Sequence, residues 1–172
     1  EAGGGVGPET EFTAEANPES FDLEVARGWV AAGVNRLSLG SQSFQEPVLR
    51  WMGRLHGAEG AAEAVARARR VGLHDVSVDL IFGLPDAVER DWGADLETSL
   101  ALEVPHLSLY GLTAEEGTPL GRRVREGRIE MPDDERYRDE YLEAHRRLTE
   151  AGYQHYEVSN FALPGHRSRH NA

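Results

Sequence analysis

The sequence predicts an α/β fold in which parallel strands alternate with helices. Three predicted helices end in the same way, with a glycine between the helix and the next strand: Ala32-Gly33-Val34, Val71-Gly72-Leu73 and Ala151-Gly152-Tyr153. A glycine just past a helix can take the left-handed conformation that lets the chain turn into a strand. Repeated units of helix, glycine and strand are typical of βαβ arrays, which form parallel sheets with right-handed crossovers.

Polar side chains at the ends of five short apolar stretches are the second observation. Leu37-Ser38-Leu39 leads to Ser41-Gln42-Ser43, and Val76-Ser77-Val78 leads to Asp79. The carboxyl ends of parallel strands share one rim, where ligands bind in α/β sheets and barrels. The sequence therefore predicts a site at that rim. The other three stretches end at Glu15 and Asn17, at Tyr110 and Thr113, and at Glu157, Ser159 and Asn160.

The first half of the chain contains three predicted strands and three predicted helices. The helix at about 58–71 has an apolar stripe suited to packing on a sheet, formed by Ala61, Ala64, Val65, Ala68 and Val71. The expected strands lie at about 11–16, 35–40 and 76–82, and the other expected helices at about 21–32 and 45–52.

The second half continues the alternation. Asp86 and Glu89 predict a capping box for a helix at about 87–102. The last helix, at about 133–151, follows Pro132 and opens with acidic residues that suit the positive end of its dipole. We expect strands at about 106–110 and 153–158, with an irregular segment rich in Gly and Arg at 111–131.

Composition excludes several classes of function. The 172 residues carry a net charge of −12, which argues against a nucleic-acid partner because phosphate binding needs basic surface. An apolar run of transmembrane length and a signal-peptide pattern are both absent from the sequence, so we expect a cytoplasmic protein. The chain has no cysteine, which excludes disulfides, thiolate-held zinc and an iron–sulfur cluster bound by its own cysteines.

Among the rim residues, Asp79 carries the strongest functional signal. It lies between Val78 and Leu80 in an apolar strand, where an ionised group is costly unless it is paired or hydrogen-bonded. Glu15 is equally compatible with a solvated loop and with a ligand contact, and Gln42 could simply cap the next helix. Arg54 is either a surface charge or a partner for a carboxylate or phosphate.

Three other features have plain explanations when taken alone. Tyr110 is a typical core residue, and Glu157 can point into solvent, as strand glutamates usually do. The glycine run at 3–7 indicates a connector rather than a phosphate cradle, because no predicted strand precedes it. His170 with Asn171 has no interpretation from the residues alone.

Seven stretches, taken together and in order, carry a family resemblance over residues 11–172. They are AEANP (14–18), NRLSLGSQSF (35–44), MGRLH (52–56), VDLIFGLP (78–85), HLSLYGLT (106–113), YEVSNFA (156–162) and HN (170–171). This set resembles the radical S-adenosylmethionine proteins related to oxygen-independent coproporphyrinogen III oxidase. The last two stretches are similar to the heme chaperone branch of that group rather than to the oxidase.

The resemblance implies a partial (β/α) barrel with S-adenosylmethionine across its open top. It also implies a [4Fe-4S] cluster, held by three cysteines in an N-terminal loop, which reduces this cofactor to a 5′-deoxyadenosyl radical. Carried over by motif, the cofactor-binding residues are Glu15, Gln42, Arg54, Asp79 and, more weakly, Thr113. A guanidinium can pair with the cofactor's carboxylate, and carboxylates and an amide can bind its ribose hydroxyls or ammonium.

The departures from the family pattern indicate an internal fragment of a longer protein. The three-cysteine loop and the first barrel units are missing, so the chain alone should be inactive, and we assign it no catalytic residue and no metal ligand. The predicted organisation is a connector at 1–10, the partial barrel at 11–162 and the start of a C-terminal region at 163–172.

The resemblance leaves three functions open. The first is a heme chaperone that binds heme and delivers it to acceptor proteins, with His170 as a candidate heme ligand. The second is the oxidative decarboxylation of coproporphyrinogen III, and the third is a barrel-derived binding module without chemistry.

Overall fold

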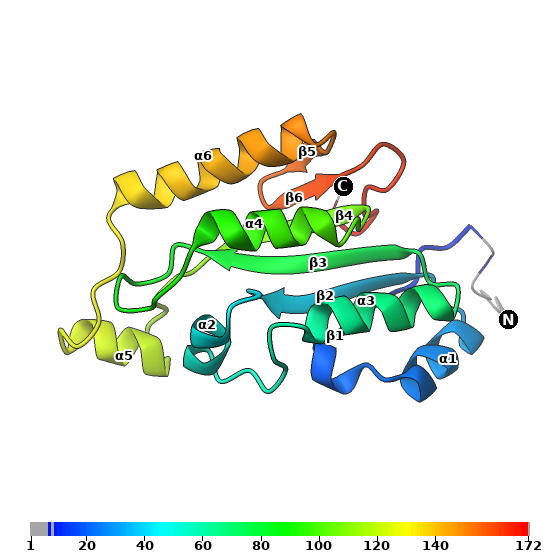
Figure 1. Ribbon diagram of the computed structural model, residues 1–172, viewed down its shortest axis with the longest axis horizontal. Coiled ribbons are helices and arrows are strands. Elements are labelled where there is room, and N and C mark those ends of the chain that lie inside the picture. The colour runs from blue at the N-terminus through cyan, green and yellow to red at the C-terminus, as the bar shows by residue number, and fades with distance from the viewer. Residues whose placement is uncertain (1–6, 8, 172) are drawn as a thin grey trace, which may run out of the picture.

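Six strands among the described residues form a single sheet. The computed structural model describes residue 7 and residues 9–171, so most of the predicted connector at 1–10 lies outside the described residues. The strand order is β1-β2-β3-β4-β6-β5 (Figure 1). The strands are β1 (Thr13–Ala16), β2 (Arg36–Gln42), β3 (Asp75–Phe82), β4 (His106–Gly111), β5 (Gln154–Glu157) and β6 (Asn160–Ala162).

Strands β1 to β4 are parallel, as predicted, and helices connect them. The sheet is open, with β1 and β5 at its two ends. This confirms an α/β fold with a partial barrel. The helices are η1 (Pro18–Ser20), α1 (Leu23–Ala31), α2 (Glu46–Trp51), α3 (Gly60–Arg70), α4 (Trp92–Ala101), α5 (Pro119–Arg125) and α6 (Asp134–Glu150).

The prediction that the last strand is parallel is wrong. Strand β5 pairs antiparallel with β6, and β6 pairs antiparallel with β4, so the chain ends its sheet with a hairpin. Only Val158 and Ser159 separate β5 from β6. A connection this short can join antiparallel strands, whereas parallel strands need a long crossover. The strand at 153–158 is therefore present, but its direction and its partner β6 were not foreseen.

The two faces of the sheet differ in chemistry because successive side chains point to opposite sides. On β3, Val76, Val78 and Leu80 are buried in the main hydrophobic core, whereas Ser77 and Asp79 lie on the other face. Figure 1 shows α1, α3, α4 and α6 along one face of the sheet. The predicted stripe of α3 is confirmed: its alanines and Val65 are buried in this core, and Val71 packs against it. The opposite, polar face is left to form the site.

The glycine turns are confirmed by their backbone angles. Gly33, Gly72 and Gly152, each just past a helix, have φ values of 96°, 83° and 93°. A residue with a Cβ rarely adopts this conformation, which explains why glycine recurs there.

Two local predictions are wrong. Helix α4 begins at Trp92, and its N-cap is Asp91, whose carboxylate accepts a hydrogen bond from the Ala94 amide at 3.0 Å. The capping box at Asp86 and Glu89 does not form. Residues 86–88 make a turn, closed by a hydrogen bond from the Val88 amide to the Pro85 carbonyl at 2.9 Å, and Arg90 pairs with Glu140 of α6 at 2.6 Å before the helix begins. Helix α5 forms inside the segment expected to be irregular. Its Thr118 N-cap and the proline that follows are ordinary start signals.

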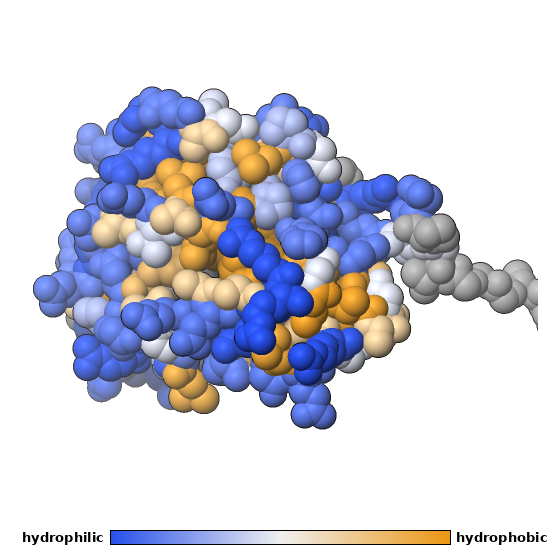
Figure 2. Space-filling view, turned by 45° about the vertical axis from the view of Figure 1, so that its right-hand side comes forward, coloured by the Kyte–Doolittle hydropathy of each residue, from blue (hydrophilic) through white to orange (hydrophobic). Residues whose placement is uncertain are grey.

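The outer surface is mixed in character. Figure 2 shows hydrophobic residues in the middle of this view, with hydrophilic residues around them. Among the described residues, no helix combines the length and the apolar character needed to cross a membrane.

Candidate functional site

A polar cavity of about 330 Å³ lies on the face of the sheet opposite the helices. Strand register explains its composition: Glu15, Ser38 and Ser77 lie side by side on β1, β2 and β3, and Asp79 lies beside Ser108 on β4. All of its lining residues are polar: Thr13, Glu15, Arg36, Ser38, Ser77, Asp79, His106, Ser108, Tyr110, Ser168, His170 and Asn171.

Among the described residues, hydroxyl groups alone bind the Asp79 carboxylate. The Ser38 hydroxyl donates to its carboxylate at 2.9 Å, and the Ser77 hydroxyl does so at 3.3 Å. Burial raises the pKa of Asp79; hydrogen bonds from Ser38, Ser108 and Ser77 lower it, and the negative charge of Glu15 raises it again. Within the described residues no basic side chain forms an ion pair with Asp79. The carboxylate therefore remains available to hydroxyl or ammonium groups of a ligand.

His106 forms the floor of the cavity. Its Nδ1 lies 2.7 Å from the Ser77 hydroxyl, and its Nε2 lies 2.8 Å from the hydroxyl of Tyr156 on β5. Burial, together with the positive charge of Arg36, lowers the pKa of His106 to about 3. The imidazole is therefore neutral near pH 7 and has one donor and one acceptor nitrogen. The Tyr156 hydroxyl also accepts a hydrogen bond from the Ser168 amide at 3.1 Å, so this chain of contacts reaches the C-terminal segment.

A second cluster lies at the carboxyl ends of β1 and β2. The Nη1 of Arg54, in the loop after α2, donates to Oδ1 of Asn17 at 2.6 Å. Gln42 ends β2 with a left-handed φ of 70°, which is unusual for a residue other than glycine. A Cβ added to Gly40 would lie 2.9 Å from Nε2 of Gln42 and 3.3 Å from Oδ1 of Asn17. Three polar side chains from three segments therefore meet above Gly40.

Asp95 was missed by the sequence reasoning, although it fixes the loop that follows Gln42. Its carboxylate, fully buried on α4, accepts hydrogen bonds from the Ser43 hydroxyl and the Phe44 amide, each at 2.9 Å. Burial raises the pKa of this carboxyl, and these hydrogen bonds lower it. The available signal was an acidic residue on the apolar face of a helix, directly before the buried Leu96.

The structure brings the predicted residues together in part. Glu15 and Asp79 line the polar cavity, and His170 lines it from the segment that covers the amino ends of the strands. Gln42 and Arg54 gather above Gly40 instead. Thr113 is exposed just after β4, and the one hydrogen bond that its hydroxyl makes to a described residue goes to the Gly111 carbonyl oxygen, 3.5 Å away.

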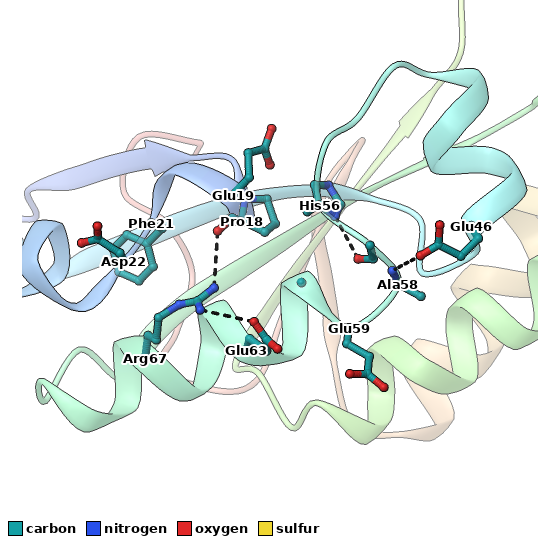
Figure 3. Close-up of a pocket in the computed structure, with 12 residues that line it drawn as sticks. Pro18, Glu19, Phe21, Asp22, Glu46, His56, Ala58, Glu59, Glu63 and Arg67 are labelled. Carbon is teal, nitrogen blue, oxygen red and sulfur yellow. Dashed lines mark hydrogen bonds and ion pairs between the residues drawn. The ribbon is translucent and has the colours of Figure 1, made fainter.

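A larger cavity of about 610 Å³ lies between η1, the loop at 56–59 and α3 (Figure 3). Its polar groups largely bind one another: Arg67 reaches the Pro18 carbonyl and Glu63, and Glu46 accepts a hydrogen bond from the Ala58 amide at 2.8 Å. In the part of the chain that the structure describes, no group of three acidic or histidine side chains is arranged to hold a metal ion. These contacts support the loop that carries Arg54, so the polar cavity is the better candidate for a site.

The sequence matches a known protein family. The family model described as "Radical SAM superfamily" matches residues 5–98, more than half of the chain. The chain belongs to the radical SAM superfamily.

Its similar proteins include heme chaperones. It is 36% identical over 167 residues to "Heme chaperone HemW" of Synechocystis, covering 97% of this chain and 40% of that protein. It is 40% identical over 163 residues to the Escherichia coli protein of the same name, covering 95% of this chain and 42% of that protein. The chain thus spans about two fifths of the length of these relatives. The predicted resemblance to the heme chaperone branch is confirmed.

The solved structure of coproporphyrinogen III oxidase (HemN) from Escherichia coli is also similar. It has a TM-score of 0.77 and 26% identity, covering 92% of this chain and 36% of that one. This similarity supports the partial barrel.

The superfamily implies two cofactors, and the chain's residues fit them unequally. Carboxylate, amide and guanidinium groups at the carboxyl ends of β1 to β3 match the hydroxyl, ammonium and carboxylate groups of S-adenosylmethionine. The chain has no cysteine, so it supplies no thiolate to a [4Fe-4S] cluster.

Proposed function

We propose that this chain is the part of a longer heme chaperone that binds S-adenosylmethionine at the carboxyl ends of its parallel strands. The observation that carries the proposal is the set of charges there without opposite partners. Asp79 is bound by serine hydroxyls and Arg54 by a neutral amide, and Glu15 has no hydrogen bond or ion pair within the described residues. Charges left in this state at a sheet rim favour a charged ligand.

Each predicted residue has a distinct role in this proposal. Asp79 and Glu15 bind the ribose hydroxyls or the ammonium group of S-adenosylmethionine, because ionised carboxylates only accept hydrogen bonds. Arg54 binds the carboxylate, and Gln42 adds an amide donor. Thr113 makes a weaker contact. The cluster would supply reducing electrons, and its thiolate ligands would come from outside this chain.

Heme is the proposed cargo, as the name of the relatives suggests, with delivery to acceptor proteins. The polar cavity is a poor match for a macrocycle with two apolar faces, because ligand sites for such groups are lined mainly by apolar side chains. We therefore propose that heme binds outside it. His170 lines this cavity, but it is exposed and also lines a second cavity beside Arg169, so it is the candidate ligand from the C-terminal segment. The cytoplasmic location also stays a prediction.

The test compares heme uptake with decarboxylation in the full-length protein with its cluster reconstituted. Titration with hemin, followed by absorption, should show stoichiometric binding and transfer to a heme-free acceptor. Coproporphyrinogen III should remain unchanged when S-adenosylmethionine and a reductant are present. Turnover to protoporphyrinogen would favour the oxidase instead. Failure to bind either hemin or S-adenosylmethionine would leave a binding module without chemistry.

A further inference from the structure

Asn17 occupies the centre of the cluster above Gly40. It directly follows β1, while Gln42 ends β2 and Arg54 comes from the loop after α2. The 2.6 Å contact between Arg54 Nη1 and Asn17 Oδ1 is the only side-chain hydrogen bond of Arg54 within the described residues. The position of this guanidinium therefore depends on one amide.

Gly40 provides the space for this arrangement. Its backbone lies in β2 without a positive φ, next to a shift in register between Gly40 and Gln42, so alanine would be tolerated by the backbone itself. The obstacle is steric, because a Cβ would come within 2.9 Å of the Gln42 amide nitrogen and 3.3 Å of the Asn17 oxygen. A methyl group at residue 40 would have to push these two amides away.

We propose that Asn17 is a positioning residue for Arg54: its amide oxygen holds the guanidinium where it can bind the α-carboxylate of an amino-acid ligand. This inference rests on the proposed function, in which that carboxylate belongs to S-adenosylmethionine.

The chemistry of an amide suits this role better than that of a carboxylate. The Asn17 oxygen accepts a hydrogen bond from the guanidinium and so fixes its position. Because the amide is neutral, the full positive charge of Arg54 is kept for the ligand. An aspartate in the same place would form an ion pair with Arg54 and compete with the ligand carboxylate.

The experiment measures binding by calorimetry to the full-length protein with its cluster reconstituted. Two ligands are compared: S-adenosylmethionine and 5′-methylthioadenosine, which lacks the amino-acid portion. The variants are Asn17→Ala, Asn17→Asp and Gly40→Ala. The matched control is Asn35→Ala, since Asn35 at the opposite end of the strands binds the backbone of Phe12 and Thr10.

Each Asn17 variant should weaken S-adenosylmethionine binding about tenfold, the size expected for one charge-assisted hydrogen bond. Gly40→Ala should weaken it in the same direction. Binding of 5′-methylthioadenosine should stay within about twofold in all three, and Asn35→Ala should leave the ratio of the two affinities unchanged. Combining Asn17→Ala with Arg54→Ala should cost little more than Arg54→Ala alone, because Asn17 acts through that guanidinium.

Three results would overturn the inference. Equal losses for both ligands would indicate a merely structural role, and additive losses with Arg54→Ala would deny the coupling. Unchanged S-adenosylmethionine binding in the Asn17 variants would reject the positioning role of Asn17 while leaving the proposed function intact. An unmutated protein that fails to bind S-adenosylmethionine would instead reject the proposed function and this inference with it.

Discussion

The two ends of the parallel strands treat their charges differently. At the amino end, Arg36 lies 3.7 Å from the Glu11 carboxylate and donates to the His166 carbonyl at 2.8 Å, while the His166 ring contacts Asp75. Toward the carboxyl end, among the described residues, Arg54 is bound only by the neutral side chain of Asn17, and the Asp79 carboxylate only by hydroxyl groups.

The difference separates charges that hold the fold from charges that can hold a ligand. The amino-end contacts fasten the C-terminal segment over the sheet, and they satisfy both partners. The charged groups toward the carboxyl end have no oppositely charged partner among the described residues, so they can still form ion pairs. A site for a cofactor with both a positive and a negative group needs this property. Substitutions at the amino end should therefore reduce stability, and substitutions at the carboxyl end should reduce binding.

The largest expected effect is on stability, from Arg36→Ala. Removing this buried guanidinium leaves the His166 carbonyl without its donor and takes away the ion pair of Glu11, which keeps its hydrogen bonds from Ser168 and Arg169. The free energy of unfolding should fall by about 2 kcal/mol. Urea unfolding measures this change. Arg27→Ala, at an exposed position on α1, is the control and should change stability by less than about 0.5 kcal/mol. If the two variants were equally stable, the contacts of Arg36 would not be what holds the C-terminal segment on the sheet.

Arg54→Ala should reduce ligand binding and leave stability nearly unchanged, the reverse of the effect expected for Arg36→Ala. We expect S-adenosylmethionine affinity to fall at least about tenfold, with a stability change below about 0.5 kcal/mol. Asp79→Ala should also lose affinity while the fold is retained. Calorimetry and urea unfolding are measured on the same samples, with Arg50→Ala on α2 as an exposed control. Unchanged binding would remove Arg54 and Asp79 from the proposed site.

His106 should make the free energy of unfolding depend on pH. Between pH 6.5 and about 3 the unfolded chain protonates this imidazole whereas the folded chain does not, so acidification through this window favours unfolding. In His106→Gln this contribution disappears, while that of Asp79 remains in both proteins. Stability should therefore fall less steeply on acidification in the variant, by up to about 1.4 kcal/mol per pH unit. Parallel stability curves would contradict the neutral state of His106.

The smallest expected effect is that of Thr113→Ala. Its exposed hydroxyl makes one long contact to neighbouring backbone, so both stability and S-adenosylmethionine affinity should change by less than about 0.5 kcal/mol. A larger loss of affinity, measured by calorimetry, would move this residue into the main binding set.

Signals that repeat along the chain predicted most of the fold. The three glycine turns and the stripe of α3 are local patterns, and the structure confirms them. The hairpin β5–β6 was not predicted. The direction of a strand depends on the strand with which it pairs, and the residues at 156–162 do not by themselves indicate that partner. The start of α4 was misplaced because the Arg90–Glu140 pair, a contact across 50 residues, decides where the loop ends.

The candidate site divides in the same way. Asp79 was predictable because a carboxylate inside an apolar strand is conspicuous. Asp95 and the contact of Asn17 with Arg54 were not, because their partners lie 51 and 37 residues away in sequence. The family motif predicted that Gln42 belongs to the site. It did not predict that the missing side chain of Gly40 leaves space for the Gln42 amide.

The left-handed backbone of Gln42 has a consequence of its own. A side chain in this conformation costs of order 1 kcal/mol, which glycine would not incur. Gln42→Gly should therefore make the protein harder to unfold while removing an amide from the rim. Comparing glutamine with glycine at this position therefore measures, in one pair of proteins, what the amide costs in stability and what it contributes to binding.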